Sequence, residues 1–484
     1  MTLVERRSQL FIAGTWREAA TRDTIPVEDP STGELTGELA AASASDVDDA
    51  VAAARASLAG AWGKTTAAER GRLLAKIGHA VLEQADQLAQ LEARDVGKPL
   101  TQARNDAVAL ARYLEFYGGA ADKLHGETIP FQNGYTVYTL REPHGVTGHI
   151  IPWNYPMQIV GRSVVAALAA GNAAVLKPAE QASLTALAFT RIAEDCGLPA
   201  GALNVVTGLG ETTGAALSAH PGINHISFTG STAVGAMIQT AAAQNAVPVT
   251  LELGGKSPQL VFADADLDRA AQFCVNAAIQ NAGQTCSASS RILVQRDVFD
   301  AFTALMAARY RALRSGPALS DLELGPLISA EQKQRVRRYA DLARRDGAVL
   351  AEGTVVADAP KGGHYITPML VTGLASDHAV AQEEVFGPLQ TVFPFDTEDE
   401  AIAIANGTPY GLVAGVWTRD GARQMRLARV LNAGQVFINN YGAGGGVELP
   451  FGGTGRSGHG REKGFEALYG FTRLKTVAAW HGEG

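Results

Sequence analysis

Cysteine is scarce in this sequence, which contains only Cys196, Cys274 and Cys286 among 484 residues. An odd, sparse set without Cys-x-x-Cys spacing argues against a disulfide framework and against a cysteine-ligated metal. We therefore expect no metal site. Reduced thiols in the cytoplasm are the simplest interpretation of this pattern.

Long apolar runs and blocks of basic residues are also missing. The most apolar stretch, residues 164–176, is interrupted by Gly171-Asn172 and is shorter than the roughly 20 residues that a bilayer requires. Residues 1–14 lack the sustained apolar core of a secretory signal. The net charge is −8 and the charges are interspersed, so no basic stripe follows a phosphate backbone. We expect neither a membrane nor a nucleic acid as partner.

The hydrophobic pattern predicts an α/β protein of two or three domains. Helical periodicity covers residues 45–58, 66–94 and 100–118, and Thr66-Ala-Ala-Glu69 has the form of a capping box. Further on, Ser329 is placed to cap a basic helix that ends near Gly347. Short apolar strands alternate with helical stretches over residues 145–262 and again over 260–440, which is typical of parallel sheets. The strands expected in the first region are 146–151, 173–177, 203–207, 226–228 and 249–253.

Two segments far apart in the chain have the alternation of exposed strands. Residues 128–141 form a strand or hairpin around Asn133-Gly134, and residues 469–477 return to strand-like residues near the end. A strand left over at the end is able to pair with the hairpin of another subunit.

Cys286 lies in Gly283-Gln-Thr-Cys286, downstream of a lone acid, Glu252, in Leu251-Glu-Leu-Gly-Gly-Lys256. A thiol and a carboxylate suggest covalent catalysis, which requires a polar, partly open pocket that lowers the pKa of the thiol. For a single cysteine, an inert buried thiol is nevertheless the better interpretation. Other segments must decide between the two.

Residues 226–235 predict a strand, a tight turn and a helix whose N-terminus suits a pyrophosphate, with Ser231 at the turn. The glycine spacing is Gly-x-x-x-x-Gly, so glycines needed for packing alone are an equal alternative. Lys177 and Glu180 follow a strand, where they are able to bind ribose hydroxyls. Because a carboxylate repels a 2′-phosphate, NAD is favoured over NADP. An ordinary exposed Lys-Glu pair is the other interpretation.

Pro152-Trp-Asn-Tyr-Pro156 predicts a rigid loop at the carboxyl end of a strand, where α/β proteins bind ligands. The side-chain amide of Asn154 on such a loop is a good donor to an oxyanion. A loop that only packs is an equally good interpretation of this segment alone.

Taken together, the chain resembles the aldehyde dehydrogenase superfamily over nearly its whole length. Seven ordered motifs carry this resemblance: Pro152-Trp-Asn-Tyr-Pro156, Lys177-Pro-Ala-Glu180, Phe228-Thr-Gly-Ser231, Leu251-Glu-Leu-Gly-Gly-Lys256, Gly283-Gln-Thr-Cys286, Glu383-Glu-Val-Phe-Gly-Pro388, and Pro450-Phe-Gly-Gly453 with Ser457-Gly-His-Gly-Arg-Glu462.

The resemblance implies a role for each matching residue. Cys286 is the nucleophile, Glu252 the general base and Asn154 the oxyanion donor. The implied cofactor is NAD, with NADP as a possible alternative. The residues implied to contact it are Ile151, Trp153, Lys177, Glu180, Gly230, Ser231, Gly235, Leu253, Glu384 and Phe386.

The same resemblance implies three domains. An atypical Rossmann-type NAD-binding domain takes residues 1–123 and 144–254, and an α/β catalytic domain takes residues 255–453. A small β bridging domain, residues 124–143 and 465–484, assembles a homodimer or homotetramer.

The implied reaction is oxidation of an aldehyde to the carboxylic acid. A thiohemiacetal and then a thioester form on Cys286, and water activated by Glu252 hydrolyses the thioester. The presence of Glu252 favours hydrolysis over transfer of the acyl group to coenzyme A. Two alternatives are a cofactor-independent cysteine esterase, although no histidine lies in any motif beside a nucleophile, and a scaffold that has lost its chemistry.

Substrate identity depends on few residues. Position 162 is arginine where many relatives, including those acting on betaine aldehyde, have tryptophan, so a trimethylammonium substrate is disfavoured. Arg162 in the tunnel would pair with a carboxylate or phenolate, but an arginine facing solvent or an interface is slightly favoured. Tyr155 and Tyr441 are further candidates for substrate contact. The glycines of residues 441–449 predict a wide entrance, which suits a bulky or aromatic aldehyde or a semialdehyde.

Overall fold

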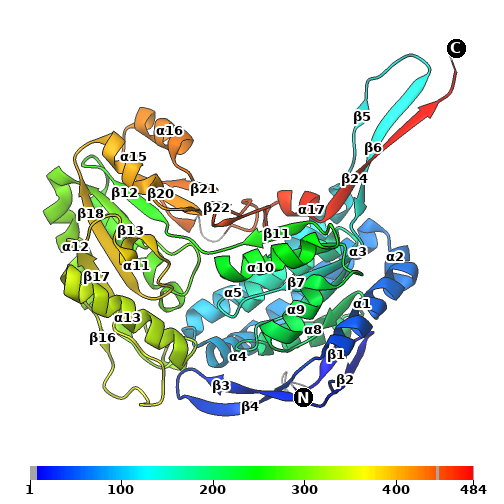
Figure 1. The fold of residues 1–484 in the computed structure, drawn as a ribbon, viewed down its shortest axis with the longest axis horizontal. Helices are drawn as coiled ribbons and strands as arrows, with labels where there is room; N and C mark the ends of the chain where they lie inside the picture. The colour runs from blue at the N-terminus through cyan, green and yellow to red at the C-terminus, as the bar shows by residue number, and fades with distance from the viewer. Residues whose placement is uncertain (1–7, 443–445, 483–484) are drawn as a thin grey trace.

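The chain is described by a computed structural model, which covers residues 8–442 and 446–482. Two large sheets, each with helices packed against it, contain most of the chain, and a smaller three-stranded sheet projects from the body (Figure 1). The expected α/β fold is confirmed. The division into three domains at the boundaries given above stays a prediction.

The first large sheet has a parallel centre and antiparallel edges, in the order β2-β1-β9-β8-β7-β10-β11-β23. All five strands expected from residues 146–253 are present in its centre. Its strands are β1 (Leu10–Ile12), β2 (Thr15–Arg17), β7 (Val146–Ile150), β8 (Ala173–Lys177), β9 (Leu203–Val205), β10 (His225–Thr229), β11 (Val249–Glu252) and β23 (Gly458–His459).

The second large sheet is built from later residues, in the order β15-β17-β18-β13-β12-β20-β21. All neighbouring pairs are parallel except β15 with β17. Its strands are β12 (Pro258–Val261), β13 (Arg291–Gln295), β15 (Ala348–Glu352), β17 (Met369–Thr372), β18 (Leu389–Phe395), β20 (Val413–Trp417) and β21 (Gln435–Ile438).

The projecting sheet joins β5 (Thr128–Ile129), β6 (Tyr135–Pro143) and β24 (Thr472–Trp480). β24 pairs antiparallel with β6 of the same chain, from Thr472 opposite Pro143 to Trp480 opposite Tyr135. The expected pairing with another subunit's hairpin is therefore wrong, because β6 offers its own chain a full-length edge. The start of the expected strand 469–477 is also different, since Tyr469 belongs to the short helix α17 (Glu466–Gly470).

The chain also contains separate two-stranded sheets. β3 (Thr24–Asp29) and β4 (Glu34–Ala40) form an antiparallel hairpin near the N-terminal end of the described chain. The remaining two-stranded sheets are β14 (Arg314–Ser315) with β16 (Thr354–Val355), and β19 (Tyr410–Gly411) with β22 (Thr454–Gly455).

The helices begin largely where the sequence predicts. Thr66 and Glu69 form the expected capping box, and the side chain of Ser329 caps the basic helix as predicted. The single helix expected over residues 66–94 is instead two helices that meet at Gln84.

The longer helices are α1 (Ala44–Ala59), α3 (Ala67–Glu83), α4 (Ala85–Val96), α5 (Leu100–Ala120), α8 (Leu184–Asp195), α10 (Thr232–Ala243), α11 (Leu267–Ile279), α12 (Phe299–Arg311), α13 (Ala330–Asp346), α15 (Glu398–Asn406) and α16 (Gly421–Val430). The shorter ones are α2 (Ala61–Lys64), α6 (Pro156–Ile159), α7 (Ala166–Ala169), α9 (Ala215–Ala219) and α14 (Ala379–Gln382).

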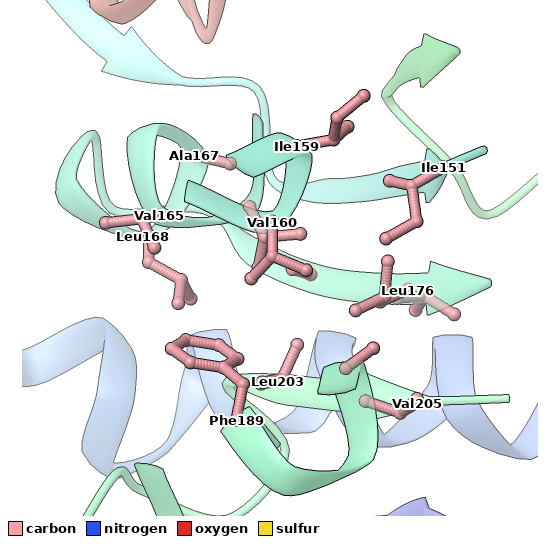
Figure 2. Packing of buried hydrophobic residues seen from close by; sticks show 14 of the residues in the cluster. Ile151, Ile159, Val160, Val165, Ala167, Leu168, Leu176, Phe189, Leu203 and Val205 are labelled. Atoms are coloured by element: carbon pink, nitrogen blue, oxygen red, sulfur yellow. The ribbon is translucent and has the colours of Figure 1, made fainter. Parts of the chain in front are cut away.

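The largest core cluster surrounds the first sheet. Figure 2 shows Leu168 of α7 and Phe189 of α8 pointing toward one another, with Leu203 of β9 beside Phe189 and Leu176 of β8 beside Ile151. Burial of such aliphatic and aromatic side chains contributes about 1.5–3 kcal/mol each. This packing fixes the helices against the strands and therefore fixes the loops at the strand ends.

The strand order places a crevice at the carboxyl edge of the first sheet. From β7 the chain adds β8 and β9 on one side, and then returns to add β10 and β11 on the other. The loops that follow β7 and β10 therefore run in opposite directions and leave a crevice between them. Open α/β sheets bind ligands in such a crevice. The Pro152–Pro156 loop, Gly230-Ser231 and Glu252 all lie at this edge.

None of the helices in residues 8–442 and 446–482 is long and apolar enough to cross a membrane.

Candidate active site

A cavity of about 770 Å³ brings together most of the residues that the sequence singles out. It is lined by the loop after β7, the ends of β10 and β11, the segment containing Cys286, the start of α13 and residues close to the C-terminus. The predicted residues that line it are Trp153, Asn154, Tyr155, Arg162, Gly230, Ser231, Glu252, Cys286, Glu384, Phe386 and Tyr441. Ile151, Lys177, Glu180, Gly235 and Leu253 are not among its lining residues.

The segment before Cys286 has an unusual backbone. Asn281, Ala282 and Gly283 are consecutive residues with positive φ, at 48°, 54° and 76°. For the two residues with side chains this conformation costs about 1–3 kcal/mol each, so the surroundings must enforce it. Asn281 Nδ2 donates to the carbonyl of Asn154 at 2.9 Å, and Gln284 Nε2 donates to the carbonyl of Asn281 at 2.9 Å. The strained turn thus links the segment before Cys286 to the loop that carries Asn154.

Cys286 is half-buried and faces the cavity. Burial raises the pKa of its thiol to about 11, while Arg162 and, more weakly, Lys463 lower it. The expectation of a pocket that lowers this pKa is therefore wrong for the free protein, because the loss of solvation outweighs the attraction of the two cations. The setting is polar, but burial holds the pKa of the thiol above its ordinary value.

Asn154 is 5% exposed and its side-chain amide is fixed. Its Nδ2 donates to the carbonyl oxygen of Gln284 at 2.9 Å, two residues before Cys286. An amide nitrogen has two N–H bonds, so one hydrogen bond orients the group and leaves another donor.

Glu252 ends β11 and is 1% exposed. Within the described chain neither carboxyl oxygen has a hydrogen-bond partner. Burial raises the pKa of Glu252 well above its ordinary value and the nearby Glu462 raises it further, whereas Arg162 lowers it. A Cβ on Gly452 would lie 2.9 Å from Glu252 Oε1, so glycine there leaves room beside the carboxyl group.

One end of the cavity has features suited to a nucleotide. Ser231 is the N-cap of α10 and its side chain accepts from the amide of Val234 at 3.3 Å. Glu384 Oε1 accepts from the amide of Gly255 at 3.0 Å, and burial raises the pKa of Glu384 to about 7. The rings of Trp153 and Phe386 pack edge to face, with their centroids 5.3 Å apart.

The other predicted cofactor residues lie nearby. Lys177 Nζ donates to Glu180 Oε2 at 2.8 Å, and Lys177 is buried, so an ordinary exposed pair is the wrong interpretation. Ile151 donates its amide to the carbonyl of Lys177 at 3.1 Å. A Cβ on Gly235 would lie 2.6 Å from Leu253, so this glycine allows α10 to pack closely on the strand end.

The sequence reasoning missed two residues of α13 that lie at this end of the cavity. Gln332 Nε2 donates to the carbonyl of Phe386 at 2.7 Å, and Arg335 Nη2 donates to that of Glu384 at 2.6 Å. The sequence indicated only that both residues lie in the first turns of a helix capped by Ser329.

Arg162 lies in a π-helical turn, Val160–Val165, and is 6% exposed. It forms an ion pair with Glu462, and its Nη2 lies 3.4 Å from Thr229 Oγ1. The favoured expectation that Arg162 faces solvent or an interface is therefore wrong, because a buried carboxylate holds it inside the cavity wall. Such π-helical turns occur frequently at functional sites.

Three residues near the C-terminus complete this wall and were given no role from the sequence. Phe451 and Glu462 lie in the two parts of the last of the seven motifs, and Lys463 follows it directly. Ser227 Oγ donates to Glu462 Oε1 at 2.8 Å, while Phe451 and Lys463 line the cavity. Nothing in their spacing indicated that they would meet Arg162.

Tyr155 and Tyr441 contribute rings to the cavity. The ammonium of Lys98 lies 4.0 Å from the ring centroid of Tyr155, and Lys98 itself is paired with Glu92 and Asp106. Tyr441 donates its hydroxyl to the carbonyl of Ser287 at 2.6 Å. Residues 443–445 of the glycine-rich segment, on which the expected wide entrance depends, lie outside the described residues.

Known proteins match this chain over nearly its whole length. The model of the aldehyde dehydrogenase family matches residues 16–477. A hydroxyisobutyraldehyde dehydrogenase from Mycolicibacterium austroafricanum is 40% identical over 472 residues, which are 97% of this chain and 93% of the relative.

Solved structures agree with the family match. A crystal structure from Burkholderia cenocepacia assigned as an aldehyde dehydrogenase has a TM-score of 0.97 and 62% identity, covering 98% of this chain and 100% of the other. PnpE from Pseudomonas sp. WBC-3 has a TM-score of 0.95 and 41% identity, covering 98% of both chains, and PnpE in complex with nicotinamide adenine dinucleotide matches equally well. Betaine aldehyde dehydrogenase from Staphylococcus aureus with NAD⁺ has a TM-score of 0.94 and 34% identity, covering 98% of this chain and 95% of that one. The chain therefore belongs to the aldehyde dehydrogenase family.

Proposed function

We propose that this enzyme oxidises an aldehyde to the carboxylic acid, with NAD as hydride acceptor and Cys286 as nucleophile. The observation that carries the proposal is that Cys286, Glu252 and Asn154, from three separate segments, line one cavity that also reaches the N-terminus of α10. A nucleophile, a carboxyl group and an amide donor are the groups that acyl-enzyme chemistry requires.

The residues at the far end of the cavity fit NAD. The N-terminus of α10 suits a pyrophosphate, because its free amides and the helix dipole favour negative charge. The carboxylates of Glu180 and Glu384 are acceptors for ribose hydroxyls, and the Trp153 and Phe386 rings offer apolar surface to the nicotinamide. Since Glu180 would repel a 2′-phosphate, NAD is preferred to NADP.

The reaction begins when the Cys286 thiol loses its proton to solvent and the thiolate sulfur adds to the carbonyl carbon. The carbonyl oxygen becomes negative, and the amide of Asn154 with the backbone N–H of Cys286 donates hydrogen bonds to it. One such donor contributes about 3 kcal/mol to the transition state. NAD held at this end of the cavity would supply a hydride acceptor, and loss of hydride from this carbon would leave a thioester on Cys286.

Glu252 completes the reaction. Its ionised carboxylate takes a proton from water, whose oxygen attacks the thioester carbon and displaces the Cys286 sulfur. Arg162, Arg461 and Lys463 support ionisation of Glu252, because each lowers the pKa of Glu252 against the effect of burial. The products are the carboxylic acid and the free thiol, without transfer to coenzyme A.

The residues around Cys286 favour a bulky or aromatic aldehyde or a semialdehyde. Tyr155 and Tyr441 supply aromatic surface, and Arg162 supplies a positive charge that disfavours a trimethylammonium group.

We further infer a cytoplasmic homodimer or homotetramer. Apolar side chains of β6 and β24, among them Leu140, Leu474 and Trp480, are exposed on the projecting sheet, which supports a subunit contact there. Three unpaired thiols support a reducing compartment.

A panel of aliphatic, aromatic and semialdehyde substrates, with NAD and NADP in parallel, tests the proposal by the absorbance of the reduced nicotinamide. We expect NADH formation that Cys286→Ser abolishes. Ester hydrolysis without any aldehyde oxidation would instead favour a cysteine esterase. The described lining of the cavity contains no histidine to act as its base.

A further inference from the structure

A buried group of charged side chains lies behind the Pro152–Pro156 loop, and the proposed mechanism gives it no task. Lys98, between α4 and α5, pairs with Glu92 of α4 at 2.7 Å and with Asp106 of α5. At most 3% of any of these three residues is exposed. Three charged side chains are thus removed from water next to the catalytic cavity, which Asp106 also lines.

Such a buried group is costly for the fold. Burial raises the pKa of Glu92 to about 8, although Lys98 lowers it, because the carboxylate loses its hydration. Apolar side chains of similar size often stabilise a protein as well as a buried ion pair does, or better. Stability alone is therefore a weak reason for these residues, and their contacts toward the cavity become informative.

Lys98 contacts the cavity wall through an aromatic ring. Its ammonium is 4.0 Å from the ring centroid of Tyr155, a cation–π contact that is stronger where water is excluded. Tyr155 lines the cavity, whereas Lys98 is absent from its described lining. Burial raises the pKa of the Tyr155 hydroxyl, Lys98 lowers it and Cys286 raises it, so Tyr155 lies within electrostatic reach of both residues.

Asp106 extends the group to α6. The carboxylate oxygen that does not pair with Lys98 accepts from Gln158 Nε2 at 2.5 Å. Tyr155 is the N-cap residue of α6, and its side chain makes no capping hydrogen bond. The start of α6 is therefore held at two points, by the Tyr155 ring on Lys98 and by Gln158 on Asp106.

Asn154 directly precedes Tyr155 and depends on the same anchor. Its Nδ2 reaches the carbonyl of Gln284, at 2.9 Å, from the loop that Tyr155 ends. A donor to an oxyanion must be aimed closely, since a displacement of about 1 Å can lower a rate about a hundredfold. A side chain that fixes Tyr155 thus also fixes the aim of Asn154.

We propose that Lys98 is a positioning residue, whose ammonium fixes the ring of Tyr155 and thereby keeps Asn154 aimed at the developing oxyanion. This role rests on the proposed aldehyde oxidation. Lys98 itself touches neither substrate nor cofactor, and Glu92 and Asp106 hold its ammonium in place. The charge is required, because an apolar side chain of equal length lacks the attraction between an ammonium and the electrons of the ring.

Rapid mixing with NAD and a good aldehyde tests this role, since NADH from the first turnover appears before thioester hydrolysis. Lys98→Met should lower the first-turnover rate by about tenfold to a hundredfold, because the aim of Asn154 is lost. The affinity for NAD, measured by calorimetry, should not change, since the nucleotide end of the cavity is untouched. Lys98→Arg keeps a cation for the ring and should retain most of the rate.

A double-mutant cycle shows whether Lys98 acts through the ring. Tyr155→Leu removes the ring, and in that background Lys98→Met should cause little further loss of rate. Equal losses from Lys98→Met with and without the ring would overturn the proposal, because the two residues would then act independently.

A second variant covers the case in which Lys98→Met does not fold. Lys98→Met/Asp106→Asn removes one positive and one negative charge together, and asparagine still accepts from Gln158. Its first-turnover rate should lie well below that of Asp106→Asn alone, which keeps the ammonium beside the ring. Equal rates in these two variants would overturn the proposal.

Lys76→Met is the control for loss of a lysine. Lys76 donates to the carbonyl of Cys196 at 2.9 Å and is not among the described lining residues of the cavity, so its variant should keep the wild-type rate. A wild-type rate in Lys98→Met would overturn the positioning role. A loss of NAD affinity that matches the loss of rate would also overturn it, by showing a general disturbance of the fold. Absence of NADH formation by the wild-type enzyme from every aldehyde would instead refute the proposed function.

Discussion

Asn154 donates a hydrogen bond from its side-chain amide to the carbonyl of Gln284, at 2.9 Å. The side-chain amide of Asn281 donates in turn to the backbone carbonyl of Asn154, also at 2.9 Å. Asn154, the proposed oxyanion donor, and the segment that carries Cys286 are therefore fixed to each other, although their loops belong to different sheets. Their relative position is set before any substrate enters.

Asn154→Ala should lower kcat by about 10²- to 10³-fold, because one donor to the developing oxyanion is lost. Steady-state kinetics with a good aldehyde measures the loss, and thermal unfolding shows whether the fold is retained. Asn245→Ala is a matched control, since Asn245 makes a similar side-chain bond to the carbonyl of Ala219 at 2.9 Å, away from the cavity. An equal loss in both variants would contradict the assigned role.

Glu252→Gln should keep acylation and slow deacylation. The amide has the shape of the carboxyl group but accepts no proton from water, so thioester hydrolysis becomes limiting. Rapid mixing should show a burst of NADH followed by a slow steady rate. Glu466→Gln, which changes an exposed carboxylate, serves as the control. A steady rate equal to wild type, with chemistry limiting, would show that Glu252 is not the base.

Alkylation of Cys286 in the free enzyme should accelerate with pH across the neutral and alkaline range. Burial raises the pKa of this thiol to about 11, and only the thiolate reacts. The rate with iodoacetamide should therefore rise about tenfold per pH unit up to about pH 10. Peptide mapping identifies the labelled residue and Cys286→Ser gives the background. A rate that levels off near neutral pH would mean that the cations outweigh burial.

His149 should make the protein sensitive to acid. It is fully buried, and burial lowers its pKa from 6.5 to about 3. Since the unfolded chain binds the proton more tightly, stability is lost as pH falls from about 6.5 to 3, at up to about 1.4 kcal/mol per pH unit. Denaturant unfolding between pH 7 and about pH 4 should give a shallower dependence for His149→Gln. Parallel curves for the two proteins would exclude this histidine as a cause.

The sequence predicts local features of this fold better than distant contacts. The capping box at Thr66 and the cap at Ser329 were visible because both depend on neighbours three residues away. Gln84, where the expected helix 66–94 divides, carries no glycine or proline signal. Pairing of β24 with β6 joins segments more than three hundred residues apart, and no local pattern indicates which copy of the chain supplies the partner.

The same contrast applies to the site. Cys286, Glu252 and Asn154 were found because each lies in a distinctive motif. Arg162 was placed wrongly, since its burial depends on Glu462, a partner 300 positions later. The raised pKa of Cys286 could not be predicted from its small polar neighbours, because it depends on how completely other segments exclude water from the thiol.

The ion pair between Arg162 and Glu462 has a consequence for synthesis of the enzyme. Ribosomes release the N-terminal part of a protein first, so residues 451–463 emerge well after Arg162 and Cys286. Until then the first sheet lacks β23 and Arg162 lacks its carboxylate, although Cys286 has already been made. A nascent chain that has not yet reached residue 463 thus contains Cys286 without the wall beside it, and we expect it to be inactive toward aldehydes.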